Sequence, residues 1–266
     1  MRLQCYKRHF LTLALVAGSS LRAISAQAQT ALDDILRTKL LKVAVQTDSA
    51  PYGFVGTDLK PIGLDIDVAQ YIAKQLGVAL ELVPVVSASR IPALQTHKAD
   101  LVIATLGKNA EREKVIDFSV AYSPFFQAVF GPKTISVQSF ADLAGKSIGV
   151  TRGAMEDQEL GKVAPTSTDT KRFEDNNATI SAYVSGQVQL VALGASVAGN
   201  MMAKNPQVST EYKLLLKESP NYIGIAKGED AFKAKVNAII LQAKKSGDLD
   251  AMAKKWLGRP AGDLPQ

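Results

Sequence analysis

Residues 63–76, GLDIDVAQYIAKQL, carry the pattern of a short amphipathic helix. Asp65 and Asp67 suit the positive, N-terminal end of a helix dipole, and Gly77 suits its C-cap. Apolar side chains recur at the spacing of one helix face, at Ile66, Ala69, Ile72, Ala73 and Leu76. The stretch therefore predicts a helix that packs against a core.

Strand-like segments flank this helix. LLKVAVQT (40–47) precedes it and VALELVPV (78–85) follows it. A helical segment, SASRIPALQTHKA (87–99), then leads to DLVIAT (100–105). Strands that alternate with helices predict an α/β protein with a parallel sheet covered on both faces. Ligands of such sheets bind beyond the carboxyl ends of the strands.

The alternation breaks at an extended aromatic segment, VAYSPFFQAVFGPK (120–133), and then resumes. A second α/β run starts at SFADLAGKSIGV (139–150). We predict two lobes that face each other across a cleft, with two short crossings that act as a hinge. The predicted boundaries are 29–131 plus 223–266 for lobe one and 132–222 for lobe two, with crossings near Gly131–Pro132 and Asn221–Gly224.

The N-terminus has the three-part pattern of a secretory signal peptide. Arg2, Lys7 and Arg8 form a basic start, and a mainly apolar run follows it. Ala-Gln-Ala at 26–28 then predicts cleavage before Gln29. The apolar run is shorter than the ~20 residues that a spanning helix needs, which argues against a membrane anchor.

Charge and cysteine content change once residues 1–28 are removed. The 266-residue chain has 31 Lys and Arg against 25 Asp and Glu, and four of the basic residues lie in the predicted signal peptide, so 27 − 25 leaves a net charge of +2 instead of +6. This near balance argues against nucleic-acid binding. The one cysteine, Cys5, also leaves, so the mature chain has no disulfide, catalytic thiol or thiolate metal ligand. We expect no metal and no cofactor.

The segment Gly63-Leu64-Asp65-Ile66-Asp67-Val68, followed by its helix, resembles the signature of the family-3 periplasmic solute-binding proteins, which are polar amino-acid receptors of ABC importers. Similar matches occur along the chain, in APYGF (50–54), IPALQTHKADLVIATLGKNAEREKVIDFSVAY (91–122), DLAGKSIGV (142–150) and YIGIAKGED (222–230). The resemblance implies a two-lobed, type II periplasmic-binding-protein-like fold. It also implies a ligand held in the cleft between the lobes.

The resemblance assigns ligand contacts on lobe one. It gives Thr105, the backbone of Gly107 and Arg112 to the α-carboxylate and α-ammonium of the ligand. The chemistry supports this, because a guanidinium offers two parallel N–H donors to a carboxylate and a glycine lets the main chain approach closely. Two further loops are expected to contact the ligand side chain, through Ser49, Tyr52, Phe54 and Ser87. Arg90 either binds a second acidic group of the ligand or has a packing or surface role.

On lobe two, the turn TRGAME (151–156) lies at a predicted helix start, which suits an anion. The resemblance implies that Thr151, Ala154, Met155 and Glu156 line the site. Family members carry an Asp near the end of a lobe-two strand that binds the ligand ammonium, and here that position falls on Gly194. Asp48, Glu156 and Asp157 are candidates for the missing charge, with a surface role as the alternative for each.

These features predict a periplasmic binding protein and not an enzyme. We expect a monomer that binds a small carboxylate and docks on an ABC permease in the inner membrane. The chain lacks H-E-x-x-H, G-x-S-x-G and P-loop motifs. The alternative is a periplasmic enzyme on the same scaffold that resembles cyclohexadienyl dehydratase. A receptor for a separate sensor protein is a third hypothesis.

Overall fold

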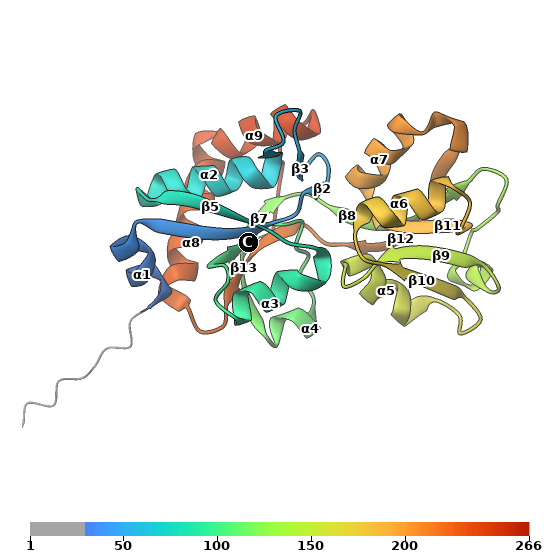
Figure 1. The fold of residues 1–266 in the computed structure, drawn as a ribbon, viewed down its shortest axis with the longest axis horizontal. Helices are drawn as coiled ribbons and strands as arrows, with labels where there is room; N and C mark the ends of the chain where they lie inside the picture. The colour runs from blue at the N-terminus through green and yellow to red at the C-terminus, as the bar shows by residue number, and fades with distance from the viewer. Residues whose placement is uncertain (1–29, 266) are drawn as a thin grey trace, which may run out of the picture.

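The computed structural model describes residues 30–265 as two lobes of mixed α/β structure side by side (Figure 1). The predicted signal peptide, with Cys5, lies outside the described residues. No helix within residues 30–265 is long and apolar enough to span a membrane.

Each lobe has a five-stranded sheet of the same design, in which three parallel strands are followed by an antiparallel strand and then by a fifth. The first sheet has the order β5 (Ala79–Pro84), β1 (Leu40–Val45), β6 (Leu101–Val102), β13 (Asn221–Ala226) and β7 (Ile116–Ser123). The second has the order β10 (Asp169–Phe173), β9 (Ser147–Thr151), β11 (Leu190–Gly194), β8 (Phe126–Pro132) and β12 (Thr210–Glu218). A small sheet at the cleft joins β2 (Asp48–Ser49), β3 (Gly53–Val55) and β4 (Pro61–Ile62).

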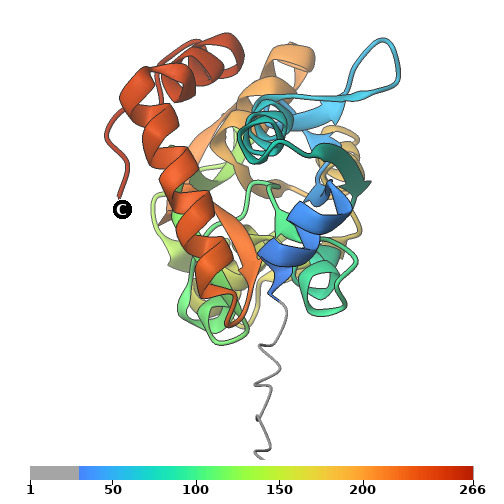
Figure 2. The same cartoon turned by 90° about the vertical axis from the view of Figure 1, so that its left-hand side faces the viewer.

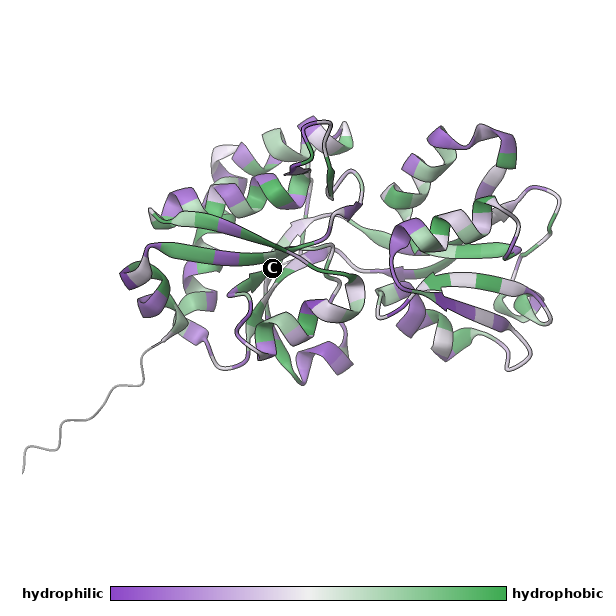
Figure 3. Cartoon of the chain, viewed as in Figure 1, coloured by the Kyte–Doolittle hydropathy of each residue, from purple (hydrophilic) through white to green (hydrophobic). Residues whose placement is uncertain are grey.

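Helices cover both faces of each sheet, so the strands are mainly apolar and the outer helix faces polar (Figure 3). Figure 2 looks onto the end of the first lobe, where α8 and α9 run together along one flank. The first lobe carries α1 (Ala31–Thr38), α2 (Leu64–Leu76), α3 (Arg90–Gln95), α4 (Ala110–Glu113), α8 (Asp230–Ser246) and α9 (Asp248–Leu257). The second carries α5 (Met155–Val163), α6 (Asn176–Val184) and α7 (Ala195–Lys204). Three 3-10 turns complete the structure, at Ser87–Ser89, Phe140–Leu143 and Pro206–Val208.

The helix predicted from residues 63–76 is α2, and its apolar face is buried in the first-lobe core as the spacing required. Gly77 adopts the left-handed conformation of a C-cap, with φ 68°. Asp65, at the helix start, is fully buried, and its carboxylate accepts hydrogen bonds from the Tyr122 hydroxyl (2.6 Å) and from the Thr105 N–H (2.9 Å). The predicted helix therefore also fixes the loop that follows β6.

The chain changes sheets at two adjacent crossings. β7 and β8 lie in different sheets, so the first crossing is residues 124–125, and β12 and β13 place the second at residues 219–220. The Ser219 N–H donates to the Phe125 carbonyl (3.3 Å), which ties the crossings together. The first crossing thus precedes the sequence-based boundary at 131/132, because β8 pairs with β11 and β12 and not with the first sheet.

Candidate ligand-binding site

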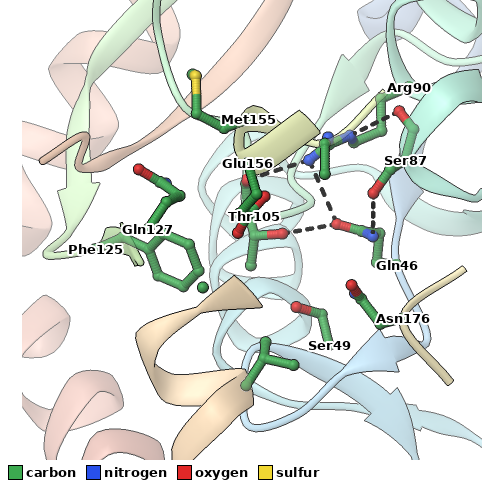
Figure 4. Close-up of a pocket in the computed structure, with 13 residues that line it drawn as sticks. Gln46, Ser49, Ser87, Arg90, Thr105, Phe125, Gln127, Met155, Glu156 and Asn176 are labelled. Carbon is green, nitrogen blue, oxygen red and sulfur yellow. Dashed lines mark hydrogen bonds between the residues drawn. The ribbon is translucent and has the colours of Figure 1, made fainter. Parts of the chain in front are cut away.

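A small polar cavity lies between the lobes, beyond the carboxyl ends of β1 and β6 and of β9 and β11 (Figure 4). About 20 Å³ of it admits the centre of a water molecule. The first lobe lines it with Gln46, Ser49, Ser87, Arg90 and Thr105. The first crossing and the second lobe line it with Phe125, Gln127, Ala154, Met155, Glu156, Asn176, Gly194 and Val197.

The cavity wall includes Ser49, Ser87, Thr105, Ala154, Met155, Glu156 and Gly194 from the residues expected in the site. Three others support the wall from behind. The Tyr52 hydroxyl donates to the carbonyl of Pro124 in the first crossing (2.9 Å), the Thr151 hydroxyl donates to Asn176 (2.8 Å), and Gly107 lies against the Met155 side chain. Each of these contacts fixes a residue that itself borders the cavity or the hinge.

Phe54 is not brought to the cavity. Its ring packs edge to face on Trp256, with ring centroids 5.8 Å apart, and lines a separate groove of about 490 Å³ whose walls come from α9 of the first lobe and α7 of the second. Trp256 in turn donates its indole N–H to Asp67 (2.8 Å), so it anchors α9 to α2. The two rings thus belong to the packing of the C-terminal helix.

The wall also contains five residues that the sequence did not predict: Gln46, Phe125, Gln127, Asn176 and Val197. Gln46 directly follows β1, and the rule that ligands bind beyond strand ends would have identified it. Its side-chain amide bridges two other wall residues of the first lobe. The Oε1 accepts from the Thr105 hydroxyl (2.7 Å), and the Nε2 donates to the Ser87 hydroxyl (3.0 Å). Gln127 and Asn176 reach the cavity through strand pairing and lobe packing, for which the sequence carries no local signal.

Thr105 is held in an unfavourable backbone conformation. Its φ is 46°, in the left-handed region that β-branched residues avoid, at a cost of about 1–3 kcal/mol. The Asp65 carboxylate compensates by accepting the Thr105 N–H. Burial raises the pKa of Asp65 to about 6, against the opposing effect of these hydrogen bonds. The strained loop directs the Thr105 side chain to the cavity wall.

Arg90 organises this wall through backbone carbonyls. It is 3% exposed, its Nε donates to Ser87 O (3.0 Å), and its Nη1 donates to Ala104 O (2.9 Å) and Thr105 O (3.1 Å). Its Nη2 crosses to the second lobe and donates to Gly153 O (3.2 Å). Burial lowers its pKa, against the charges of nearby carboxylates. Arg90 therefore has a positioning role in the strand-end loops.

Arg112 lies beside Arg90 and is also 3% exposed. Its Nη1 donates to Gly107 O (2.8 Å) and its Nη2 donates to Gly153 O (3.1 Å), so both guanidiniums meet at one carbonyl of the second lobe. Within residues 30–265 its Nε has no hydrogen-bond partner. Burial, followed by the charge of Arg90, lowers the pKa of Arg112 to about 9. Arg112 is thus a buried cation beside Arg90 with one unpaired donor, and it is not among the residues that line the cavity.

The three acids considered for the missing ammonium partner have different surroundings. Asp48 accepts the Asn176 N–H at the start of α6 (2.8 Å), a contact between the lobes. Asp157 accepts the Gly153 N–H (3.1 Å) and pairs with Arg172 (2.7 Å) inside the second lobe. Of the three, Glu156 alone lines the cavity. Burial raises its pKa, opposed by its own backbone N–H and by the charges of Arg90 and Arg112.

Gly194, where an Asp was expected, packs directly against the Phe125 ring. A Cβ at position 194 would overlap the ring carbons, so the structure has no space for a side chain there. Phe125 thus occupies the volume that an aspartate at this position would need.

Comparisons with known proteins agree with this architecture. Residues 41–259 match the family model of the bacterial extracellular solute-binding proteins, family 3. The chain is 27% identical over 245 residues to the ABC transporter glutamine-binding protein GlnH of Bacillus subtilis (strain 168), covering 90% of this chain and 89% of that protein.

Solved structures are similar over the same region. An ancestral arginine-binding protein bound to arginine is 34% identical with a TM-score of 0.79, covering 83% of this chain and 99% of that one. The ancestral amino acid-binding protein AncCDT-1, described as a precursor of cyclohexadienyl dehydratase, is 30% identical with a TM-score of 0.77, covering 85% and 98%.

Proposed function

Since the chain belongs to family 3 of the bacterial extracellular solute-binding proteins, we propose that it is the solute receptor of an ABC importer. Its ligand is an amino acid or a related small carboxylate, held between the two lobes. The relatives support this class, because one is a glutamine-binding protein of an ABC transporter and another has a structure with bound arginine. In this proposal the receptor is a monomer, and its closed form docks on the permease in the inner membrane.

The unpaired Nε of Arg112 carries the proposal. A buried N–H without an acceptor costs about 1–3 kcal/mol, which a ligand acceptor would recover. Among the described residues, the neighbouring Nη2 donates only to Gly153 O of the second lobe. Separation of the lobes removes that carbonyl and leaves Nε and Nη2 as one fork, the geometry that binds a carboxylate with two hydrogen bonds.

Ligand capture in this proposal begins on the first lobe, because its donors are fixed by the Asp65 and Arg90 networks. The second lobe then closes over the ligand by motion at the two crossings. Direct contacts between the lobes favour closure, including the Asn176 N–H to Asp48 and the Asn109 amide to Gln158 (2.8 Å each). Closure requires only that the ligand bind the closed form better than the open one.

We further propose that the chain is exported with residues 1–28 as a cleaved signal peptide, and that it acts in the periplasm. The extracellular nature of the family supports this. Mass spectrometry of the exported protein should give an N-terminus at Gln29. A mature chain that retains residues 1–28 would contradict the proposal.

An enzyme on the same scaffold is the competing hypothesis. AncCDT-1 is described as a precursor of cyclohexadienyl dehydratase, and Glu156 lines the cavity with a raised pKa, as a general acid requires. We favour the receptor, because the named relatives are binding proteins. Incubation with prephenate or arogenate distinguishes the two: formation of an aromatic product that Glu156→Gln abolishes would establish the enzyme.

Arg112→Ala tests the receptor. A thermal-shift screen of the mature chain with L-amino acids and small carboxylates should find a ligand that raises Tm. Calorimetry with that compound should then show a loss of affinity of about 100-fold or more in Arg112→Ala, and a large loss in Arg112→Lys, which keeps the charge without the fork. Arg37→Ala, on the exposed face of α1, is the control and should bind normally. Unchanged affinity in Arg112→Ala would refute the assignment.

A further inference from the structure

A groove separate from the cavity lies between the lobes, on the side of the molecule that carries β3, α9 and α7 (Figure 1). Its volume is about 490 Å³, and none of its lining residues also lines the cavity. One wall comes from the turn between β2 and β3 and from the end of α9, and the other comes from α7. Small-molecule sites have volumes of about 300–1,000 Å³ and often lie where two domains meet, so the groove has the size and position of a ligand site.

The first-lobe wall of this groove is apolar and partly aromatic. It is formed mainly by Pro51, Phe54, Trp256 and Leu257. The two aromatic rings meet edge to face, with their centroids 5.8 Å apart, and both side chains are only partly buried. Apolar surface in contact with water favours a ligand that covers it. The wall therefore suits a ligand with an aromatic or aliphatic body.

Two cations border the same wall. Arg259 follows the end of α9, and Lys204 ends α7 on the opposite lobe. Both are exposed, and within residues 30–265 neither forms an ion pair or a side-chain hydrogen bond. A third cation, Lys255, lies 4.7 Å from the centroid of the Trp256 ring, but it is paired with Asp67 (2.8 Å). The groove thus joins an apolar wall to two cations without a counter-charge.

The positions of acidic residues indicate where an anionic group fits best. Among the described residues, none that lines the groove is acidic. An adjoining hollow of about 320 Å³ shares Phe54, Asn200 and Lys204 with the groove, and it is bordered by Asp48. Arg259 borders the groove and not this hollow. A carboxylate beside Arg259 therefore avoids the Asp48 charge.

We propose that this groove is a second binding site, which takes a small organic acid with an aromatic body. The ring of the ligand packs on Phe54 and Trp256, and its carboxylate pairs with Arg259 and Lys204. A guanidinium offers parallel N–H donors that match a carboxylate, and the ammonium adds a point charge from the other lobe. The inference goes beyond the proposed function, because it involves neither the cavity nor Arg112.

Trp256 provides a direct readout, because it is the one tryptophan of the chain and it lines the groove. The probe is hydrocinnamate, and its neutral partner is hydrocinnamyl alcohol, which has the same ring and chain length. Titration of the mature chain should give a saturable change in tryptophan fluorescence with the acid. The alcohol should bind at least about tenfold more weakly, as expected for the loss of charge-assisted hydrogen bonds. Acetate, which lacks the ring, should give no saturable change at the same concentrations.

Variants assign this binding to the groove. The double variant Lys204→Gln plus Arg259→Gln removes both charges, so it should lower the affinity for hydrocinnamate at least about tenfold and change that for the alcohol little. Arg37→Gln plus Lys98→Gln removes the same charge from exposed positions outside the groove and should leave both affinities unchanged. Arg112→Ala removes the cation proposed for the cavity ligand, and binding to the groove should persist in it.

The outcomes separate the second site from the proposed function. A saturable signal that requires the carboxylate and the two groove cations, and that persists in Arg112→Ala, supports the second site. The absence of a saturable signal, or equal affinities for the acid and the alcohol, would overturn it. The comparison of acid with alcohol uses one folded sample, so it holds even where a variant folds poorly. A signal lost in Arg112→Ala but retained in the double groove variant would place the acid in the cavity, which refutes the groove site and leaves the receptor proposal standing.

Discussion

The two faces of the cavity differ in how completely their polar groups are paired. On the first lobe, Gln46, Arg90 and Thr105 bind one another and nearby carbonyls in one buried network. On the second lobe, the buried side-chain oxygen of Gln127 has no hydrogen-bond partner within residues 30–265. A paired network keeps its geometry when the lobes separate, whereas unpaired acceptors gain most when a ligand arrives. The first face is therefore preorganised, whereas the second keeps an acceptor that a ligand donor could pair.

The pH dependence of stability offers the largest test of this contrast, through Asp65 beneath the first face. Its pKa is about 6 in the folded chain and 3.8 in an unstructured chain, so the folded state holds more protons between these values. Asp65 alone should therefore lower the free energy of unfolding by about 3 kcal/mol as the pH rises from about 4 to 6, at 1.36 kcal/mol per pKa unit. Urea unfolding at several pH values measures this change.

Asp65→Asn isolates the contribution of that one group. The amide does not titrate, so the variant should lack about 3 kcal/mol of the decrease seen in the parent chain. Asp142→Asn is a suitable comparison, because Asp142 is exposed and its pKa is lowered, not raised, by hydrogen bonds from Gln138 and Ser139. Parallel pH profiles for the parent and Asp65→Asn would mean that folding does not raise the pKa of Asp65.

Local sequence pattern predicted the helix and strands that carry the first face, and the family resemblance supplied its contact residues, but Gln46 was missed. The helix at 63–76 and the strand before Thr105 are encoded by periodicity, and the loop after a buried parallel strand opens to the cleft. Even there, the burial of Asp65 was not foreseen. An acid at a helix start suits the dipole equally well in solvent, and its contact with Tyr122 joins residues far apart in the chain.

The second face was only partly predictable. Glu156 was expected in the site from the family resemblance, at a turn that begins a helix. Gln127 was not expected, because it lies in an extended, aromatic segment whose pattern suits either lobe. Its position depends on the pairing of β8 with β11, which local propensity does not specify. The same pairing explains why the first crossing falls at 124–125 and not at 131–132.

Gly194→Asp tests whether the Phe125 ring excludes an acidic side chain at position 194. The new side chain would overlap the Phe125 ring, so we expect a loss of about 1–3 kcal/mol in the free energy of unfolding, typical of overpacking. Truncating the ring in the double variant Phe125→Ala plus Gly194→Asp frees that volume. In the Phe125→Ala background, Gly194→Asp should then lower the free energy of unfolding much less than it does in the parent chain. A double-mutant cycle by urea unfolding measures this difference. Additive losses would show that the ring is not the obstacle.

Gln158→Ala tests the contact between the faces and has the smallest expected effect. The Gln158 side chain accepts the Asn109 amide across the lobes (2.8 Å), and the bond exists only when the lobes are together. Loss of this hydrogen bond should disfavour closure by about 0.5–1.5 kcal/mol. It should therefore lower the affinity for the amino acid identified in the screen by about 2- to 10-fold. Tm without ligand should change little, because Gln158 is not part of the hydrophobic core of either lobe. Gln187→Ala, at an exposed second-lobe position, controls for the loss of a surface amide.

Because closure follows capture, the lower affinity of Gln158→Ala should appear mainly as faster ligand dissociation in stopped-flow fluorescence. An effect confined to the association rate would contradict this order of events.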